Sequence, residues 1–234
     1  MVSLGVRIDG IGTTNLTVHG VEKIDGRHEG APSEDPVESM FFVALASTLG
    51  SDITIERVPM DFLDIELRLL SKMGLKFTQS LSYVGRNGRV RLSDVTIKPS
   101  KLMSIGEKIA PMPYPGLNID NLPFFVPIAT QTQGRVLIHD WVYENRAVYY
   151  TEMNKLGADV VLADPHRVFV NGPTTLTPAD IEAPPALRPA TTLLIGMLGA
   201  DGESTLRNVY PINRGYENLH ERLKTLGAKI EAYE

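Results

Sequence analysis

Three segments of this 234-residue chain share one plan, and this internal repeat limits the possible folds more than any other feature. Each segment has an apolar helical stretch, then an alternating, strand-like stretch, then a second helical stretch that ends at a glycine. The glycines on either side of the second helical stretch are 24, 23 and 25 residues apart, in the pairs Gly50–Gly74, Gly134–Gly157 and Gly202–Gly227. One such unit cannot bury its apolar faces alone, so the repeat predicts that three units pack together.

The end of each second helix carries a further signal. Gly74, Gly157 and Gly227 follow the last apolar residue of their helices, where a left-handed C-cap favours glycine. Strand-like stretches come next, and we expect strands at 75–77, 159–162 and 229–232. The first two units add another expected strand after a turn, at 89–92 and 167–170.

The polarity of the two helices in each unit predicts their layers. The first helix is apolar nearly all round, which is typical of burial at the centre. The second is amphipathic, as the spacing of Tyr216, Leu219, Leu223 and Leu226 shows. Helices inside and sheets outside give an α/β (α+β) fold of the inside-out barrel type with three pseudo-repeats. A three-layer α+β arrangement is the alternative, and spacing alone does not decide between them.

The same signals divide the chain into segments. We expect short strands and a connector over residues 1–30, and one domain over residues 31–234. Its repeats run over about 31–100, 101–173 and 174–234.

Composition excludes several classes of protein. The chain has no cysteine, so it contains no disulfide scaffold and no thiol nucleophile. With 23 basic and 28 acidic residues and no basic stripe, it does not have the pattern of a nucleic-acid-binding protein. Its apolar runs are too short to cross a bilayer and its N-terminus lacks a signal peptide, so we expect no membrane and a cytoplasmic location.

Two arginines occupy equivalent places in the repeats. Arg146 follows Asn145 and Arg214 follows Asn213, where the second helix of each unit is expected to begin. A helix start attracts anions, and an arginine adds a bidentate, permanently charged donor. The pair therefore suggests a phosphate or carboxylate site. The alternative is a surface arginine beside a capping asparagine.

Asp120 ends a proline- and glycine-rich loop that runs into the buried helix of the second unit. A carboxylate held there is suited to accept a proton from a hydroxyl, although an N-cap aspartate has the same pattern. Arg188 precedes the third unit in the same way, whereas Asp35 and Glu38 before the first unit have the spacing of a capping box. The five histidines lack metal-ligand spacing and the glycines form no phosphate loop, so we expect no metal and no cofactor.

Short motifs in a fixed order carry a resemblance to a known family. They are His19–Glu22, Pro113–Asp120, Tyr143–Arg146, Leu187–Ala190 and Ile212–Glu217. Together they resemble the C-terminal half of the enolpyruvyl transferases. The match is better to the UDP-N-acetylglucosamine 1-carboxyvinyltransferase branch than to the sister branch that acts on shikimate phosphate. The resemblance implies a fold of two inside-out barrels with the active site between them.

The resemblance also implies roles for single residues. Asp120 matches the candidate base at the sugar hydroxyl, and Glu144 a second carboxylate near the reacting centre. Val142 matches a backbone contact to the UDP-sugar. Arg146, Arg188 and Arg214 match arginines of the cleft, with Arg214 the best candidate for phosphoenolpyruvate. Ala186 and Ile119 depart from the family, which has Asp and Thr there.

These roles imply one lobe of an enzyme that moves the enolpyruvyl group of phosphoenolpyruvate to the 3-hydroxyl of UDP-N-acetylglucosamine, in peptidoglycan synthesis. The partner is then the missing N-terminal lobe, which residues 1–30 would join and which would carry the proton donor. As a fragment or a split protein, the chain is expected to be nearly inactive alone. The alternatives are a non-catalytic ligand-binding or partner module on the same fold, or half of a shikimate-phosphate-type enzyme.

Overall fold

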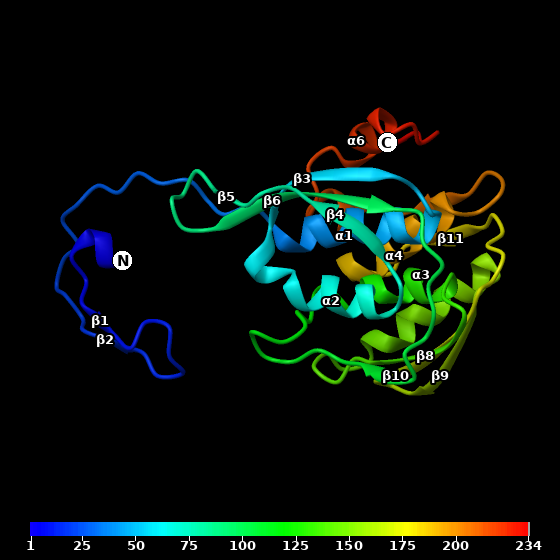
Figure 1. Cartoon of the computed structure of the whole chain (residues 1–234), viewed down its shortest axis with the longest axis horizontal. Helices are drawn as coiled ribbons and strands as arrows, with labels where there is room; N and C mark the ends of the chain where they lie inside the picture. The colour runs from blue at the N-terminus through cyan, green and yellow to red at the C-terminus, as the bar shows by residue number, and fades with distance from the viewer. Residues whose placement is uncertain (234) are drawn as a thin grey trace.

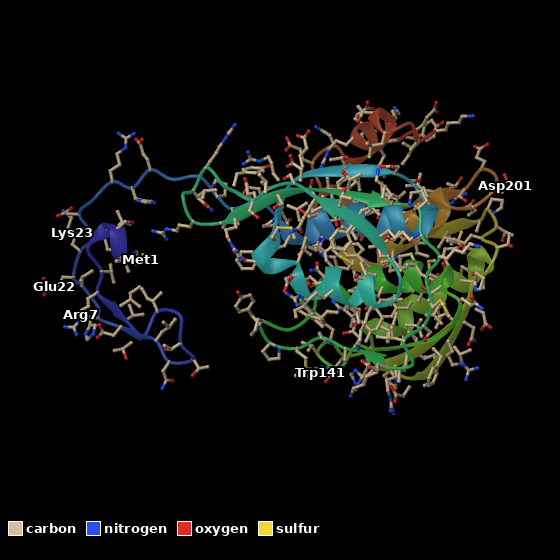
Figure 2. The ribbon with its side chains drawn as sticks, in the orientation of Figure 1. Met1, Arg7, Glu22, Lys23, Trp141 and Asp201 are labelled. Carbon is tan, nitrogen blue, oxygen red and sulfur yellow. The ribbon has the colours of Figure 1, made fainter. Side chains whose placement is uncertain are left out.

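The computed structural model describes residues 1–233 as a mixed helix-and-sheet body with a long N-terminal arm (Figure 1). The arm, residues 1–35, holds the 3₁₀ helix η1 (Val2–Leu4) and the paired strands β1 (Ile8–Asp9) and β2 (Thr17–Val18). Figure 2 shows most of the arm and its side chains lying apart from the body. Ile11, Leu16 and Val18 are all more than half exposed, so these apolar side chains pack little against the rest of the described chain.

The body follows the predicted repeat. The first unit comprises α1 (Pro36–Leu49), β3 (Ile53–Pro59), η2 (Met60–Phe62), α2 (Asp64–Lys72), β4 (Lys76–Gln79), β5 (Tyr83–Val84) and β6 (Arg91–Lys98). The second comprises β7 (Lys108–Ile109), η3 (Leu122–Phe124), α3 (Phe125–Thr130), β8 (Gly134–His139), η4 (Arg146–Leu156), β9 (Asp159–Asp164) and β10 (Arg167–Gly172). The third comprises β11 (Asp180–Glu182), α4 (Leu187–Leu198), β12 (Thr205–Arg207), α5 (Tyr210–Asn213) and α6 (Leu219–Thr225).

The layers are those expected of the inside-out arrangement. The first helices of the units, α1, α3 and α4, contact one another in pairs. Figure 1 shows them in the middle of the body, between the β3–β6–β4 sheet and the β7–β8–β10–β9 sheet. All six residues of α3 are buried, as are nearly all of α1, which explains why these helices are apolar all round.

The sheets of the first two units are built alike. In each, the strand after the second helix pairs antiparallel with the last strand of the unit, β4 with β6 and β9 with β10. In the first unit the short strand β5 lies between them in sequence and also pairs with β6. The third unit has only the parallel pair β11–β12, and the expected strand at 229–232 is not formed. The prediction was wrong because no described residue supplies the hairpin partner that β6 and β10 give the other units, and an unpaired strand leaves its backbone groups unsatisfied.

Local backbone signals were predicted well. Gly74, Gly157 and Gly227 all have positive φ, at 105°, 80° and 94°, as left-handed helix ends require. Asp35 caps α1, because its carboxylate accepts the backbone N–H groups of Val37 and Glu38. Among residues 1–233, no helix is long and apolar enough to cross a membrane.

Phe41 of α1 lies where the three units meet. Its ring is fully buried and packs edge-on against Phe124 of η3, with ring centroids 6.0 Å apart. It also contacts Tyr216, which follows α5, at 5.3 Å. One side chain of the first unit thus touches an aromatic ring from each of the other two.

We expect Phe41→Ala to lower the free energy of unfolding by about 3–5 kcal/mol, because it opens a cavity between all three units. Phe62, which is 42% exposed, is the matched control, and Phe62→Ala is expected to cost about 1 kcal/mol or less. Urea unfolding followed by circular dichroism measures both variants. Equal losses would show that the three units do not depend on the Phe41 contact.

Candidate functional site

A buried ion pair lies behind the Asp120 loop. Asp140, directly after β8, is fully buried, and Arg146 begins η4. Arg146 Nε donates to Asp140 Oδ2 at 2.5 Å and Nη2 donates to Oδ1 at 3.0 Å. Tyr150 donates its hydroxyl proton to Asp140 Oδ2 at 2.5 Å, and burial holds the pKa of that hydroxyl well above its usual value. Both carboxylate oxygens are therefore satisfied, as a buried charge requires.

Arg146 also reaches the loop itself. Its Nη2 donates to the backbone carbonyl of Ile119 at 2.8 Å, and Nη1 lies 3.8 Å from Asp120 Oδ1. The Tyr143 ring covers the guanidinium at 4.3 Å. The arginine is nearly buried, whereas the Asp120 side chain is 40% exposed. Arg146 thus fixes the loop from behind and leaves the Asp120 carboxylate open to solvent.

A second buried carboxylate holds the same loop from the first unit. Glu66 of α2 is 1% exposed, and its Oε1 accepts the backbone N–H of Asn118 at 3.1 Å and Asn121 Nδ2 at 2.7 Å. Burial raises the pKa of the Glu66 carboxyl, and the bonds from Asn121 and Asn118 offset only part of that rise.

A cavity of about 420 Å³ opens beside this loop. Asn118 and Ile119 line one side, and Trp141 and Val142 line another. Trp141 donates its indole N–H to the Pro111 carbonyl at 2.9 Å, which joins the two walls, and Figure 2 places this residue at the surface of the body. Val142, which lines this cavity, is 46% exposed.

A second group of residues lies at the third unit. Arg188, in the first turn of α4, donates to the Tyr216 hydroxyl at 3.1 Å. Burial raises the pKa of Tyr216 to about 12. Arg214 directly follows α5 and is exposed, and its neighbour Gly215 packs closely on Leu187. Arg188 and Arg214 are therefore on adjoining segments, and in residues 1–233 no hydrogen bond or ion pair joins them to Asp120.

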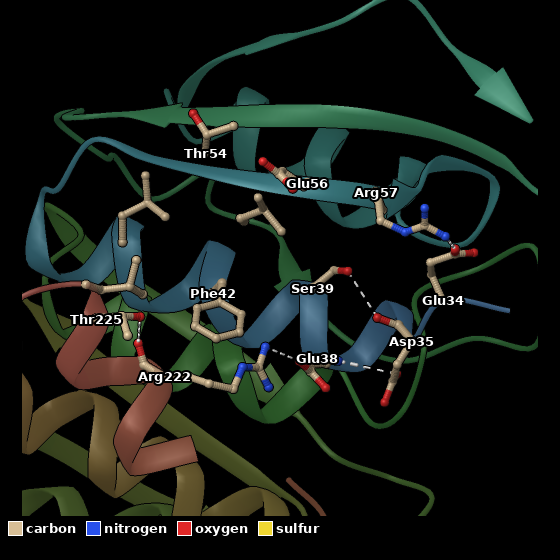
Figure 3. A pocket seen from close by; sticks show the side chains of 13 residues that line it. Glu34, Asp35, Glu38, Ser39, Phe42, Thr54, Glu56, Arg57, Arg222 and Thr225 are labelled. Atoms are coloured by element: carbon tan, nitrogen blue, oxygen red, sulfur yellow. Dashed lines mark hydrogen bonds and ion pairs between the residues drawn. The ribbon is translucent and has the colours of Figure 1, made fainter. Parts of the chain in front are cut away.

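A further pocket, of about 430 Å³, lies between α1, β3 and α6 (Figure 3). Both of its arginines are paired, Arg57 with Glu34 and Arg222 with Glu38. Asp35 caps α1, so the capping role expected from its spacing with Glu38 is confirmed for Asp35. In the described part of the chain, no group of three or more His, Asp or Glu side chains is arranged to hold a metal ion.

Comparison with known proteins gives this geometry a family. The sequence model of the EPSP synthase (3-phosphoshikimate 1-carboxyvinyltransferase) family matches residues 1–223. The chain belongs to this family.

Within the EPSP synthase family, the curated relatives carry a second name. UDP-N-acetylglucosamine 1-carboxyvinyltransferase of Treponema denticola is 33% identical over 239 aligned residues, which cover 99% of this chain and 53% of the relative. The enzyme of that name from Bacteroides fragilis is 34% identical, with 97% and 52% covered. The chain thus spans about half the length of the curated relatives it matches, and the resemblance drawn from its motifs is confirmed.

Solved structures agree on the fold. The enolpyruvyl transferase NikO from Streptomyces tendae superposes with a TM-score of 0.79 at 27% identity, over 98% of this chain and 52% of that one. EPSP synthase from Acinetobacter baumannii gives a TM-score of 0.77 at 20% identity, over 99% and 54%. The prediction of an enolpyruvyl transferase-type fold is confirmed.

The capping interpretation of the asparagines was wrong. Asn145 precedes η4 but has a positive φ of 59° and makes no side-chain capping bond. Asn213 ends α5, so Arg214 lies after a helix and not at the start of one. Asp120 is not an N-cap either, because Asn121 holds that position before η3, without a capping bond. The asparagine–arginine pairs are similar in sequence but differ in local backbone.

Two sequence details look different in the structure. Glu144 is exposed, and within residues 1–233 it makes no hydrogen bond or ion pair with Asp120 or Arg146. Ala186, where the resemblance implies Asp, is the N-cap of α4, and no side chain caps that helix. Since alanine offers no acceptor, the first-turn N–H groups of α4 lack the partner an aspartate would give.

Sequence reasoning missed Asp140, Tyr150 and Glu66. Glu66 had a usable signal, because it falls on the same helical face as Leu63, Leu67 and Leu70, where a charge is unexpected. For Asp140 the only sequence signal was its position after a strand, pointing to the face opposite to His139. Nothing in the spacing indicated that Asp140 would pair with Arg146.

We expect Asp140→Ala to lower the free energy of unfolding by about 3–5 kcal/mol, since it leaves the buried Arg146 charge without a partner. Asp180→Ala, which removes an exposed ion pair with Arg207, is the matched control and is expected to change stability by at most about 1 kcal/mol. Thermal and urea unfolding of both variants measures the difference. Equal effects would contradict a dominant role for the buried pair.

The raised pKa of Glu66 gives a pH signature. A carboxyl whose folded pKa is raised contributes stability at low pH that is lost as pH rises through the folded pKa. The stability of Glu66→Gln relative to the wild type should therefore rise as the pH increases above about 4, the usual pKa of a glutamate carboxyl. The hydrogen bond from Arg167 lowers the pKa of Asp164, so the stability of Asp164→Asn relative to the wild type should fall with rising pH, and only below about pH 5. Urea unfolding from about pH 3 upward tests both signs, and parallel slopes of the two variants would contradict them.

Proposed function

We propose that this chain is one lobe of an enolpyruvyl transferase, which moves the enolpyruvyl group of phosphoenolpyruvate to the 3-hydroxyl of UDP-N-acetylglucosamine. The observation that carries the proposal is Asp120: a solvent-open carboxylate on a loop that Arg146 and Glu66 hold from two different units, beside a cavity of about 420 Å³. The names of the curated relatives support the choice of acceptor.

In this proposal Asp120 is the general base. It accepts the proton of the acceptor hydroxyl, whose oxygen forms a bond to C2 of phosphoenolpyruvate while C3 gains a proton from the donor on the other lobe. C3 then loses a proton, the C2–O bond to phosphate breaks, the C2=C3 double bond forms again and inorganic phosphate leaves. Asp120 suits the role because its backbone is fixed while its carboxylate remains exposed. The backbone of Val142, which lines the cavity, would bind the UDP-sugar. Glu144, two residues after Val142, would be a second carboxylate near the reacting centre.

The three arginines have different roles in this proposal. Arg146 is committed to Asp140 and Ile119, so its role toward a ligand is to place Asp120 and add positive charge nearby. Arg214 is exposed and is our candidate for phosphoenolpyruvate, with Arg188 on the adjoining turn as a second donor. Neither a metal nor an organic cofactor is part of the proposal.

A second lobe completes the site in this proposal. The chain spans about half of its curated relatives, and the apolar side chains of its arm are exposed. Residues 1–30 would connect to that lobe, residues 31–234 would form this one, and the other lobe would supply the proton donor. A cleft needs both walls to exclude water and orient substrates, so we expect little activity from this chain alone. On the resemblance of its motifs, we also propose a place in peptidoglycan synthesis in the cytoplasm, without nucleic acid or membrane as partner.

We expect Asp120→Asn to lower kcat about 10²–10⁴-fold, with calorimetric binding of UDP-N-acetylglucosamine retained, because only proton transfer is lost. The assay measures phosphate release from phosphoenolpyruvate and UDP-N-acetylglucosamine by this chain together with its companion lobe. The matched control is Asp164→Asn, which changes a partly exposed carboxylate paired with Arg167 and should keep wild-type kcat.

Other outcomes would favour the alternatives. Binding of the UDP-sugar without turnover by the complete pair would support a non-catalytic module. Turnover with shikimate 3-phosphate in place of the UDP-sugar would support the sister reaction. Full activity of Asp120→Asn would remove Asp120 as the base.

A further inference from the structure

Glu66 is a buried acid that the proposed reaction does not use. It lies in the first turn of α2 on the face that packs inward, with Leu67 and Leu70 buried beside it. Surface side chains of α2 and its neighbours find charged partners, such as Arg68 with Asp64. Glu66 has no basic partner among the described residues, and its hydrogen bonds go to a loop more than fifty residues away in sequence.

The two donors to Glu66 lie on either side of Asp120. The Asn118 N–H and Asn121 Nδ2 both reach the same oxygen, Oε1. Asn121 is fully buried and its Oδ1 has no hydrogen-bond partner, so the bond to Glu66 is what orients its amide. An uncharged, apolar residue at position 66 would leave both donors unsatisfied.

Hydrogen bonds within the turn connect Asp120 to Asn118 and Asn121. The N–H of Asp120 donates to Asn118 Oδ1 at 2.9 Å, and the N–H of Asn121 donates to the Asn118 carbonyl at 3.0 Å. Arg146 holds the intervening Ile119 carbonyl. The turn that presents Asp120 is therefore fixed at residues 118, 119 and 121, and two of these three points depend on Glu66.

We propose that Glu66 is a positioning residue that fixes the turn carrying Asp120 by accepting hydrogen bonds from Asn118 and Asn121. An apolar side chain at position 66 would also lower stability, because two donors lose their acceptor, so only a measurement at the Asp120 turn separates a positioning role from a purely structural one. What it supplies is a directional acceptor for two donors that flank one exposed carboxylate. The part of the inference that concerns catalysis rests on the proposed role of Asp120.

The first test needs no turnover. Hydrogen exchange of the Asn118 amide, followed by NMR on the full chain, reports directly on the bond to Glu66. Glu66→Leu should lower its protection about tenfold or more, because the partly buried N–H loses its acceptor. Glu66→Gln keeps an oxygen at the same position and should retain protection. The Ile138 amide, in the core strand β8, is the internal control and should not change.

The second test uses phosphate release by the chain and its companion lobe. Loosening the base should lower kcat of Glu66→Leu at least tenfold with little change in KM, since the carboxylate is displaced and not removed. Glu66→Gln should restore kcat. The double variant Glu66→Leu/Asn121→Leu, which removes one of the two donors together with the acceptor, keeps the kinetic test available if Glu66→Leu folds poorly.

Wild-type protection of Asn118 in Glu66→Leu would overturn the proposal, and so would loss of protection with unchanged kcat. A wild-type pair that binds UDP-N-acetylglucosamine and does not turn over would instead count against the proposed function. In that case the exchange measurement still decides whether Glu66 fixes the turn.

Discussion

The contact of Phe41 with Phe124 and Tyr216 is the constraint on which the rest of the structure depends. Each ring comes from a different unit, and Phe41 is fully buried. No unit can bury its apolar first helix by itself, so the central helices α1, α3 and α4 must bury one another. The sheets and second helices then cover the outside. The loops that carry Asp120 and Arg214 start from this packed centre, which sets their positions.

Buried charge makes one of these loops rigid. Asp140, Arg146 and Tyr150 form a hydrogen-bonded network behind the Asp120 loop, in which both oxygens of the Asp140 carboxylate have donors. Glu66 of α2 accepts two further hydrogen bonds from the same loop. Each of these groups is costly to bury, and each is paired or hydrogen-bonded. Around Asp120 the chain thus concentrates directional polar contacts. Of Arg188 and Arg214, by contrast, only Arg188 makes a side-chain hydrogen bond within residues 1–233, and Arg214 is exposed. The proposed base is fixed more firmly than the proposed anion site.

Some of the candidate site followed from the residue pattern and some did not. Asp120 was found because a proline- and glycine-rich loop before an apolar helix is visible in sequence, but its capping role was wrong since Asn121 takes that place. Glu66 and Asn118 meet only after two units pack together, so no local period connects them. The strand expected at 229–232 had the right alternation and no described partner, which shows that alternation does not create pairing.

The sequence by itself determined the three units, their buried first helices and the glycine ends of the second helices. These follow from apolar periodicity and from backbone conformations that only local residues decide. The tertiary structure alone decided that Arg146 belongs to Asp140, that Glu66 anchors the Asp120 turn, and that Arg214 lies after a helix. Partner choice among distant polar groups depends on packing and desolvation, which are properties of the assembled fold and not of any segment.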